Sequence, residues 1–580
     1  MLKIARYLKS FKKEVIFGPI FKLIEAIFEL IIPIVTAKII DVGVKTGNVA
    51  YVWRMGGIML LLGVVGLGSA LICQKLASVA SQGFGTVVRN ELYKHINTFS
   101  HVEIDKFGTP SLITRMINDI NQLQYAVAML IRLVVRAPFL AVGAIVMAMM
   151  IDFKLSIVFL IVTPLIALVL YLVMSRSVPY FRVMQKKLDK ISLVSREGLS
   201  GARVIRAFSK RDSEEARFQE ASNEQTKTAI QVGKLSALLN PLTYSIMNFA
   251  IIAIIWFGGY RVNSGGMTQG GVIAFVNYMT QTLFALIVVA NLVVTFTKAS
   301  ASASRVNEVF ETVSSVPELN TELIETKMIA NTPKIEFKNI SFSYNNTDKY
   351  ALENLSVTIN AGETVGIIGG TGSGKSTLVN LIPRFYDVTK GNILIDGINV
   401  REYPFAQLRS IVGMVPQETV LFTGTIESNL RWGSETVNQE QINKALQIAQ
   451  AAEFVDKLPN GLQTPVDQGG KNFSGGQRQR LTIARALVCC PQILILDDSA
   501  SALDFATDAS LRKAIKNETK DMTVLMVSQR ASTIKHADKI IVLDDGEVAG
   551  IGTHKELMES CDLYQEICLS QLSRDEVNKK

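Results

Sequence analysis

Long apolar runs fill the first 300 residues and constrain the possible folds more than any other feature of the sequence. One helical span needs roughly 20 consecutive apolar residues to cross a bilayer core. Six runs meet that length, at residues 15–44, 55–78, 123–151, 155–175, 238–260 and 271–297. The remaining residues alternate short apolar and polar segments, as soluble α/β domains do. We therefore expect a six-span α-helical membrane domain followed by a soluble α/β domain.

The distribution of basic residues indicates how the spans are oriented. The formal net charge is +9 and the mean hydropathy is 0.28. Lysine and arginine crowd the long stretches 79–122 and 176–237, whereas the stretches near 45–53, 152–154 and 261–268 are short and nearly uncharged. Because positively charged loops stay in the cytoplasm, we expect both termini there and the basic stretches beside anionic membrane lipid. No groove-reading motif or aromatic-basic platform is present, so we expect no nucleic-acid partner.

A P-loop pattern lies in the soluble half. Residues Gly369 to Ser376 read G-G-T-G-S-G-K-S. In such a loop the glycines let backbone N–H groups approach phosphates, the lysine reaches the β and γ phosphates, and the serine offers its hydroxyl to Mg²⁺. The residues expected to hold nucleotide are Gly369, Gly370, Thr371, Gly372, Ser373, Gly374, Lys375, Ser376 and Thr377. The sequence therefore predicts that the chain binds ATP and Mg²⁺.

Further motifs follow the P-loop in a fixed order. Gln417 lies in V-P-Q-E, Asn472 to Gln477 read N-F-S-G-G-Q, and the apolar strand Ile493 to Leu496 ends at Asp497. The stretch Ser501 to Asp504 then reads S-A-L-D. This order and spacing resemble the ABC ATPase domain, and the six-span half resembles the membrane domain of ABC exporters.

The resemblance covers nearly the whole chain and implies its domain organisation. We expect a transmembrane domain at residues 1–304, a linker at 305–333 where the apolar pattern changes, a P-loop ABC nucleotide-binding domain at 334–572, and a charged tail at 573–580 that the resemblance does not cover. In this family ATP lies between the P-loop of one ATPase domain and the Ser-Gly-Gly of a second. Since this chain has one such domain, we expect a second ABC half-transporter chain as its partner.

The resemblance also implies roles for residues outside the P-loop. Tyr344 is expected to stack on adenine, and Mg²⁺ is expected near Ser376, Gln417 and Asp497. The signature residues would serve the partner's site, and they are Ser474, Gly475, Gly476 and Gln477. Ser501 and Asp504 would form the D-loop. The turns near 103–108 and 208–214 would be the coupling helices that rest on the ATPase domains.

Two residues depart from the family pattern where the chemistry takes place. In the family a glutamate follows the strand-ending aspartate and positions or deprotonates the attacking water, and a later histidine contacts the γ-phosphate. Here those positions hold Asp498 and Gln529. Aspartate is one methylene shorter than glutamate, which withdraws the carboxylate by about 1.5 Å, and glutamine cannot carry a proton. We therefore expect a site that binds ATP and hydrolyses it poorly.

The contrast between this weakened site and the intact signature motif suggests how the chain pairs. The pattern resembles the degenerate-site subunit of bacterial heterodimeric multidrug ABC exporters, whose intact signature completes the partner's active site. The alternative is that Asp498 is an adequate base and the chain forms an ordinary homodimer. The segment Thr464 to Gly470, T-P-V-D-Q-G-G, also departs from the T-E-V-G-E-R-G pattern common in exporters.

Charged residues inside the apolar runs allow two interpretations. Glu25 and Glu29 lie four residues apart in the first run, and Arg132 and Arg136 do so in the third, so each pair shares a helix face. The carboxylates either line a cavity that favours cationic substrates or pair with Lys22 and the arginines inside the bundle. Four uncharged residues either face the translocation path or hydrogen-bond between helices, and they are Tyr244, Asn248, Tyr278 and Gln281.

The family resemblance implies an ATP hydrolase coupled to transport across the cell membrane. ATP would close two ATPase domains and switch the transport cavity from inward- to outward-facing. By the same resemblance, the expected cargo is a hydrophobic small molecule, namely an amphipathic drug-like compound. Lipid flipping by the same architecture is the first alternative, and an ATP-gated channel or regulator of another protein is the second.

Overall fold

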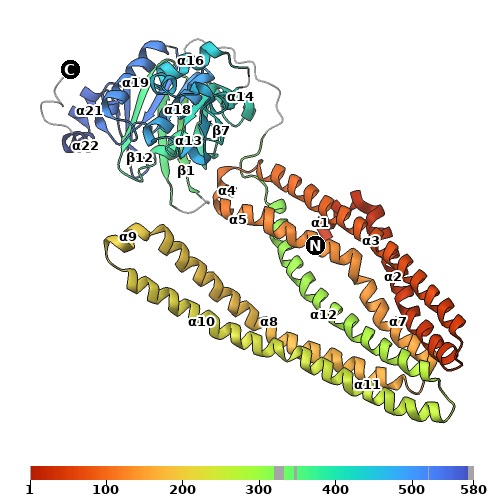
Figure 1. Cartoon of the computed structure of the whole chain (residues 1–580). Helices are drawn as coiled ribbons and strands as arrows, with labels where there is room; N and C mark the ends of the chain where they lie inside the picture. The colour runs from red at the N-terminus through yellow and green to blue at the C-terminus, as the bar shows by residue number, and fades with distance from the viewer. Residues whose placement is uncertain (1, 319–331, 345–348, 435, 520, 572–580) are drawn as a thin grey trace. The chain divides into compact units, whose positions relative to one another are not determined.

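The computed structural model describes all residues except 1, 319–331, 345–348, 435, 520 and 572–580. The expected tail, 573–580, and residues 319–331 of the expected linker lie outside the described residues. The chain divides into two compact units, one made of Met1–Asn97 with Pro110–Glu311 and the other of Thr98–Thr109 with Thr312–Lys580. Each unit is described by itself below, with elements labelled as in Figure 1.

The first unit has helices and connecting turns, and no strand among its described residues. Its N-terminal half contains α1 Leu2–Ala5, the 3-10 helix η1 Arg6–Phe11, α2 Lys12–Lys38, the π-helix η2 Ile39–Val44 and α3 Val49–Ile96. Then follow α5 Thr109–Thr114, the π-helix η3 Arg115–Asp119, α6 Ile120–Met129, the π-helix η4 Leu130–Val134 and α7 Arg136–Ile151. The second half contains α8 Ile157–Ser200, α9 Ala202–Ala207, α10 Arg211–Ala237, α11 Leu239–Asn263 and α12 Gln269–Glu311.

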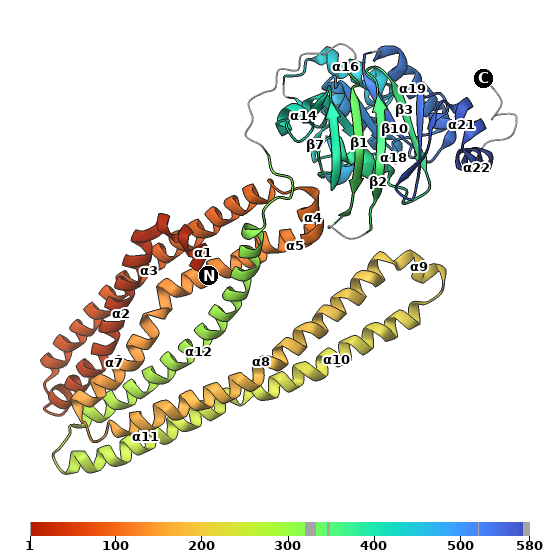
Figure 2. The ribbon, with the colours of Figure 1, turned by 180° about the vertical axis from the view of Figure 1, so that it is seen from behind.

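Helices α8 and α10 form a long antiparallel pair that is joined at one end by α9, as Figures 1 and 2 both show. The 44 residues of α8 extend roughly 66 Å at 1.5 Å per residue, about twice the thickness of a bilayer core. The first half of α8 is apolar and its second half is rich in lysine and arginine. This division fits a helix that crosses the membrane and continues beyond it as an arm.

Five described helical stretches are long and apolar enough to cross a membrane, and they are Val49–Ile96, Thr109–Ile151, Ile157–Ser200, Arg211–Asn263 and Gln269–Glu311. The remaining expected span, the first run at 15–44, corresponds to α2 and η2. Helix α2 has 27 residues, which gives it a length of about 40 Å. Three charged residues, Lys22, Glu25 and Glu29, interrupt its apolar sequence. Helix α12 ends at Glu311 and therefore covers the first residues of the expected linker.

The second unit is built on a six-stranded sheet in the order β12-β11-β3-β10-β9-β6. Its strands are β3 Thr364–Gly369, β6 Val412–Val415, β9 Ile493–Asp497, β10 Thr523–Val527, β11 Lys539–Asp544 and β12 Glu547–Gly552. All neighbouring strands are parallel except β11 and β12. The central strands are continuous apolar runs because helices bury both faces of a parallel sheet.

Smaller elements complete the second unit. An antiparallel sheet in the order β2-β1-β4-β5 contains β1 Ile335–Phe342, β2 Leu352–Ile359, β4 Lys390–Ile395 and β5 Ile398–Asn399. A two-stranded sheet joins β7 Gly424–Thr425 to β8 Pro465–Val466. The helices are α13 Lys375–Leu381, α14 Phe405–Ile411, α15 Ile426–Leu430, α16 Gln439–Ile448, α17 Ala452–Asp456, α18 Gly475–Val488, α19 Phe505–Glu518, α20 Ala531–Ile534, α21 His554–Ser560 and α22 Asp562–Gln571.

Helix α4, His101–Phe107, belongs to the second unit although it precedes most of the first unit in sequence. Ser100 begins it with a capping box, in which Glu103 accepts hydrogen bonds from the backbone N–H and hydroxyl of Ser100. The ring of His101 lies 4.8 Å from that of Phe385 between centroids. The first turn expected as a coupling helix is therefore helical and packs against the soluble unit.

Candidate nucleotide site

The expected nucleotide motifs meet at one edge of the six-stranded sheet. Val527 at the end of β10 lies opposite Asp497 on β9 and opposite Ile367 on β3. Because these strands are parallel, the loops that follow them emerge side by side, which is where open α/β sheets bind ligands. A cavity of about 370 Å³ lies there, lined by Tyr344, Ala351, Thr371, Gly372, Gly374, Lys375, Ser376, Thr377, Gln417, Asp497, Asp498, Val527 and Gln529.

The P-loop adopts a backbone that only glycine tolerates well. Gly372 and Gly374 have φ values of 86° and 93°, which lie in the left-handed region that L side chains rarely occupy. A Cβ on Gly374 would also lie 2.8 Å from the carbonyl oxygen of Ala351. Helix α13 begins directly after this loop, so its unpaired N–H groups and dipole favour an anion.

The ammonium group of Lys375 is held over its own loop. It donates hydrogen bonds to the carbonyl oxygens of Gly370, at 2.6 Å, and Gly369, at 3.0 Å. Burial lowers the pKa of Lys375, and the negative charges of Asp498 and Asp497 partly oppose that shift. A phosphate oxygen would be a stronger, charge-assisted acceptor for this ammonium than a neutral carbonyl.

The three residues expected near Mg²⁺ all line the cavity. The hydroxyl of Ser376 donates to Oδ1 of Asp497 at 2.9 Å. Burial raises the pKa of Asp497, and the neighbouring charge of Asp498 raises it further. With the amide oxygen of Gln417, these groups form an all-oxygen donor set with a single carboxylate. That set fits Mg²⁺, which usually combines one or two carboxylates with waters and substrate phosphates.

Both departures from the family pattern also line this cavity. Asp498 has a φ of 46°, and its backbone N–H donates to the carbonyl oxygen of Val527 at 3.0 Å. Burial raises the pKa of Asp498, against the opposing influence of Arg530 and Lys375. Gln529 reaches the same cavity from the loop after β10. A carboxylate and a neutral amide therefore occupy the two positions where the family has glutamate and histidine.

Tyr344, the residue expected to stack on adenine, lines the cavity. Its hydroxyl shares a hydrogen bond of 3.0 Å with the hydroxyl of Thr377. Its ring makes edge contacts with Phe342 at 4.8 Å and with Tyr386 at 5.3 Å between centroids. These contacts fix the orientation of the ring, which remains 38% exposed.

The signature and D-loop residues do not line this cavity. Ser474 begins α18 with a capping box, in which its hydroxyl accepts from the N–H of Gln477 and its N–H donates to the side chain of Gln477. Ser474 and Gly475 are exposed. Asp504 similarly begins α19 and accepts from the N–H of Thr507 at 2.9 Å. These helix starts present exposed donors that the chain's own nucleotide cavity does not use.

Comparison with known proteins decides the family. Residues 15–286 match the family described as ABC transporter transmembrane region, and residues 352–501 match the one described as ABC transporter. An uncharacterised ABC transporter ATP-binding protein of Mycobacterium tuberculosis is 39% identical over 571 residues, which cover 98% of this chain and 97% of that protein. The chain belongs to the ABC transporter family. This ABC transporter chain is an ATP hydrolase coupled to transmembrane transport.

Other relatives extend the comparison. The uncharacterised ABC transporter ATP-binding protein YfiB of Bacillus subtilis is 38% identical and covers 99% of both chains. The ATP-dependent lipid A-core flippase of Syntrophus aciditrophicus is 33% identical over 90% of this chain and 86% of that protein. A bacterial Atm1-family ABC exporter with ATP bound has the same fold, with a TM-score of 0.80 at 24% identity over 97% of this chain and 99% of that chain. The expected fold class, a helical transmembrane domain followed by an α/β ABC ATPase domain, is confirmed.

The charged residues of the first ABC transporter span form ion pairs inside the helical unit. Glu25 accepts from Lys22 at 2.6 Å, and Glu29 accepts from Arg136 at 2.7 Å. Arg136 also lies 3.9 Å from Glu25. Arg132 is half-buried and makes no ion pair within the described residues. Ion pairing inside the helical unit therefore accounts for the charges of Glu25, Glu29 and Arg136. It does not account for the charge of Arg132.

Two of the four uncharged polar residues, for which a transport path and hydrogen bonding between helices were both open, make hydrogen bonds between helices. Tyr278 is fully buried and donates to the carbonyl oxygen of Leu30 at 2.6 Å, so its side chain does not line a path. Gln281 donates to the carbonyl oxygen of Glu29 at 3.2 Å. Tyr244 and Asn248 are exposed on α11, and for them both interpretations stay open.

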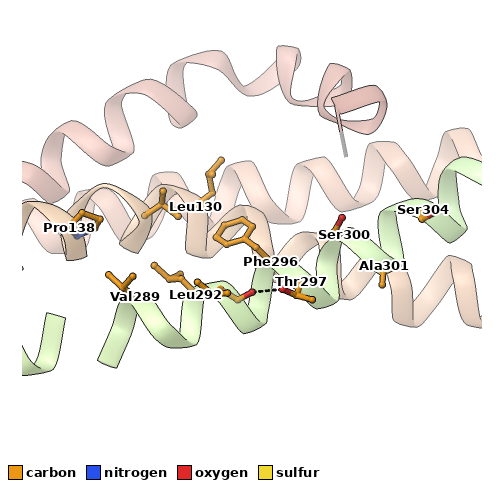
Figure 3. Close-up of a pocket in the computed structure, with 11 residues that line it drawn as sticks. Leu130, Pro138, Val289, Leu292, Phe296, Thr297, Ser300, Ala301 and Ser304 are labelled. Carbon is orange, nitrogen blue, oxygen red and sulfur yellow. Dashed lines mark hydrogen bonds between the residues drawn. The ribbon is translucent and has the colours of Figure 1, made fainter. Parts of the chain in front are cut away.

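A large apolar cavity in the helical unit was missed by the sequence analysis (Figure 3). It has a volume of about 970 Å³ and lies between η4, the start of α7 and α12. The lining residues are Leu130, Val134, Pro138, Val289, Leu292, Val293, Phe296, Thr297, Ser300, Ala301 and Ser304. None of the eight residues proposed for the substrate cavity lines it. An apolar stripe at helical spacing looks the same in sequence whether it faces a cavity or a packed core.

Proposed function

We propose that this chain is the degenerate-site subunit of a heterodimeric ATP-driven exporter in the cell membrane, with both termini in the cytoplasm. The observation that carries the proposal is that Asp498 and Gln529 line one cavity with Lys375 and Asp497. The groups needed to bind ATP are therefore present beside two groups that are poorly suited to hydrolyse it.

The chemistry of these two side chains supports ATP retention over turnover. The carboxylate of Asp498 is about 1.5 Å shorter in reach than that of glutamate, and proton transfer requires hydrogen-bond reach to the attacking water. Gln529 can donate a hydrogen bond to a phosphate oxygen but cannot supply charge. Chemistry would take place at the partner's P-loop, where Ser474, Gly475, Gly476 and Gln477 of this chain complete the site.

The conformational effect of nucleotide binding would be transmitted to the membrane domain through α4. Tyr344 contacts Tyr386, and Tyr386 and Phe385 contact His101 on α4. Closure of two ATPase domains around ATP would move these helices and convert an inward-facing cavity to an outward-facing one. This is the alternating-access cycle that the proposed exporter would follow.

Amphipathic drug-like compounds are the proposed cargo. The apolar hollow beside α12 is open to the surface and has a volume of about 970 Å³, which is at the upper end of the range for sites of drug-sized molecules. Lipid flipping is the second candidate, because a relative that is 33% identical over 90% of this chain is named a lipid A-core flippase. Inverted vesicles that hold the purified transporter separate the two: drug export predicts ATP-driven accumulation of an amphipathic dye, and flipping predicts ATP-driven movement of labelled lipid only.

The decisive test of the pairing is co-purification from native membranes. The chain, tagged at its C-terminus, is solubilised, and the chains recovered in stoichiometric amount are identified by mass. Recovery of a second six-span ABC chain with glutamate and histidine at the two departing positions would support the heterodimer. Recovery of this chain alone would mean a homodimer in which Asp498 and Gln529 must suffice, and ion conductance would then be measured to test the channel alternative.

A further inference from the structure

Gln571, the last residue of α22, is joined by two hydrogen bonds to the loop that carries Gln529. Its Nε2 donates to the carbonyl oxygen of Gln529 at 2.8 Å, and its Oε1 accepts from the N–H of Ala531 at 2.9 Å. One side chain thus binds the backbone on both sides of Arg530. Only an amide offers a donor and an acceptor side by side in this way.

Helix α22 is itself firmly anchored. Tyr564 and Cys568 are fully buried and share a hydrophobic cluster with Ala531 and Ile534 of α20. The hydroxyl of Tyr564 also lies 2.8 Å from Nδ1 of His554. The helix therefore holds a fixed position relative to the loop that its last residue contacts.

The loop is held from its other side as well. The N–H of Ser528 donates to the carbonyl oxygen of Ile367 at 3.1 Å, and its hydroxyl accepts from the N–H of Arg530 at 3.0 Å. Between these points the side chain of Gln529 enters the nucleotide cavity. If the contacts of Gln571 are removed, the carbonyl oxygen of Gln529 loses its bond to Nε2 and the N–H of Ala531 loses its bond to Oε1. The bonds of Ser528 to Ile367 and to Arg530 remain.

We propose that Gln571 is a positioning residue that holds Gln529 in place over the nucleotide, and that it thereby sets the preference of this site for ATP over ADP. The inference rests on the proposed contact between Gln529 and the γ-phosphate. A hydrogen bond contributes about 0.5–1.5 kcal/mol net, which corresponds to a roughly two- to tenfold change in an equilibrium constant.

The test uses the full-length chain in lipid nanodiscs with any partner that co-purifies. The probe is 8-azido-ATP, which reacts covalently with the chain that binds its adenine. Separation of the chains on a gel then measures the labelling of this chain independently of the labelling of a partner of different size. Competition with ATP and with ADP gives the preference of the site. Gln571→Ala is expected to lower that preference about two- to tenfold. Gln571→Glu is expected to do the same, because its carboxylate faces the carbonyl of Gln529 without a donor.

Two reference variants make the outcomes distinct. Ser570→Ala is the matched control, because the hydroxyl of Ser570 is exposed and, among the described residues, bonds only to Ile567 of its own helix. This variant should leave the preference unchanged. Gln529→Ala shows whether Gln529 senses the γ-phosphate at all. If Gln529→Ala has no effect, the proposed role of Gln529 fails and the positioning role fails with it. If Gln529→Ala lowers the preference and Gln571→Ala does not, only the positioning role is overturned. Equal weakening of ATP and ADP binding by Gln571→Ala, with a lower melting temperature, would also overturn it in favour of a purely structural contact.

Discussion

The hydroxyl of Tyr386 donates a hydrogen bond of 3.3 Å to the carboxylate of Asp105, which lies 281 residues earlier in the chain. Burial and the charge of Asp105 both raise the pKa of Tyr386, so the phenol stays protonated and remains a donor at neutral pH. The same ring packs against Tyr344, which lines the nucleotide cavity. One tyrosine therefore contacts both α4 and the expected adenine site.

Tyr386→Phe removes this hydrogen bond and keeps the aromatic packing. We expect nucleotide affinity to stay near the wild-type value, and cargo-stimulated ATP hydrolysis to fall about two- to tenfold, as the loss of one hydrogen bond would produce. Asp105→Asn serves as the second arm of a double-mutant cycle, measured as stimulated over basal ATPase activity. Additive losses from the two changes would mean that the bond does not couple α4 to the nucleotide site.

Ser474→Ala tests the signature motif. We expect it to nearly abolish hydrolysis by the assembled dimer, because Ser474 would contact the γ-phosphate held by the partner. The substitution also removes a helix cap worth about 1 kcal/mol. Thr553→Ala is therefore the matched control, since Thr553 begins α21 with the same kind of capping box and is absent from the lining of the nucleotide cavity. Similar loss of hydrolysis in both variants would trace the effect to helix stability.

Lys375→Ala tests the proposal that the P-loop of this chain retains ATP while the partner's P-loop site hydrolyses it. Loss of the ammonium should weaken photolabelling of this chain by 8-azido-ATP, because a charge-assisted contact to phosphate disappears. Substantial ATP turnover by the heterodimer should remain, since hydrolysis is assigned to the partner's P-loop. Hydrolysis that falls as far as it does in Ser474→Ala would contradict the asymmetry between the two sites.

The sequence singled out most of the residues that line the nucleotide cavity and none that line the apolar hollow beside α12, for a physical reason. Residues such as Lys375, Gln417 and Asp497 belong to motifs whose chemistry fixes residue type and spacing. Ala351 and Val527 line the same cavity and carry no motif, because they contribute only apolar surface. Side chains in the membrane unit depend on long-range packing, which local pattern does not encode.

Tyr278 and the cavity beside α12 illustrate that limit. A tyrosine in an apolar run has the same sequence signature whether it faces a path or another helix. Its hydrogen bond to Leu30 spans 248 residues of sequence, so only the fold identifies the partner. The coupling of α4 to the soluble unit was expected from family resemblance, but its specific contacts with Phe385 and Tyr386 were not.

Arg136→Ala tests whether the charges near the first span are structural. Removing one member of a partly buried ion pair leaves Glu29 uncompensated, which costs up to about 3–5 kcal/mol for a fully buried pair and less here, where the side chains are 21% and 36% exposed. We expect a lower melting temperature. Combining Arg136→Gln with Glu29→Gln should restore it with an unchanged range of transported dyes. A narrowed range in the stable double variant would instead assign the pair to cargo selection.

The raised pKa of Asp498 predicts the direction in which Asp498→Asn changes the melting temperature. Because burial raises this pKa, the folded chain without nucleotide binds a proton more tightly than the unfolded chain, and the charged carboxylate destabilises the fold at neutral pH. Asp498→Asn should therefore raise the melting temperature of the nucleotide-free chain at pH 7, on the order of 2 °C. The gain in melting temperature should shrink as pH falls through the folded pKa, since the wild-type carboxyl becomes neutral there.

Asp498→Glu should preserve or raise ATP hydrolysis by restoring the reach of the carboxylate. A collapse of activity in this variant would show that the shorter side chain has a role of its own.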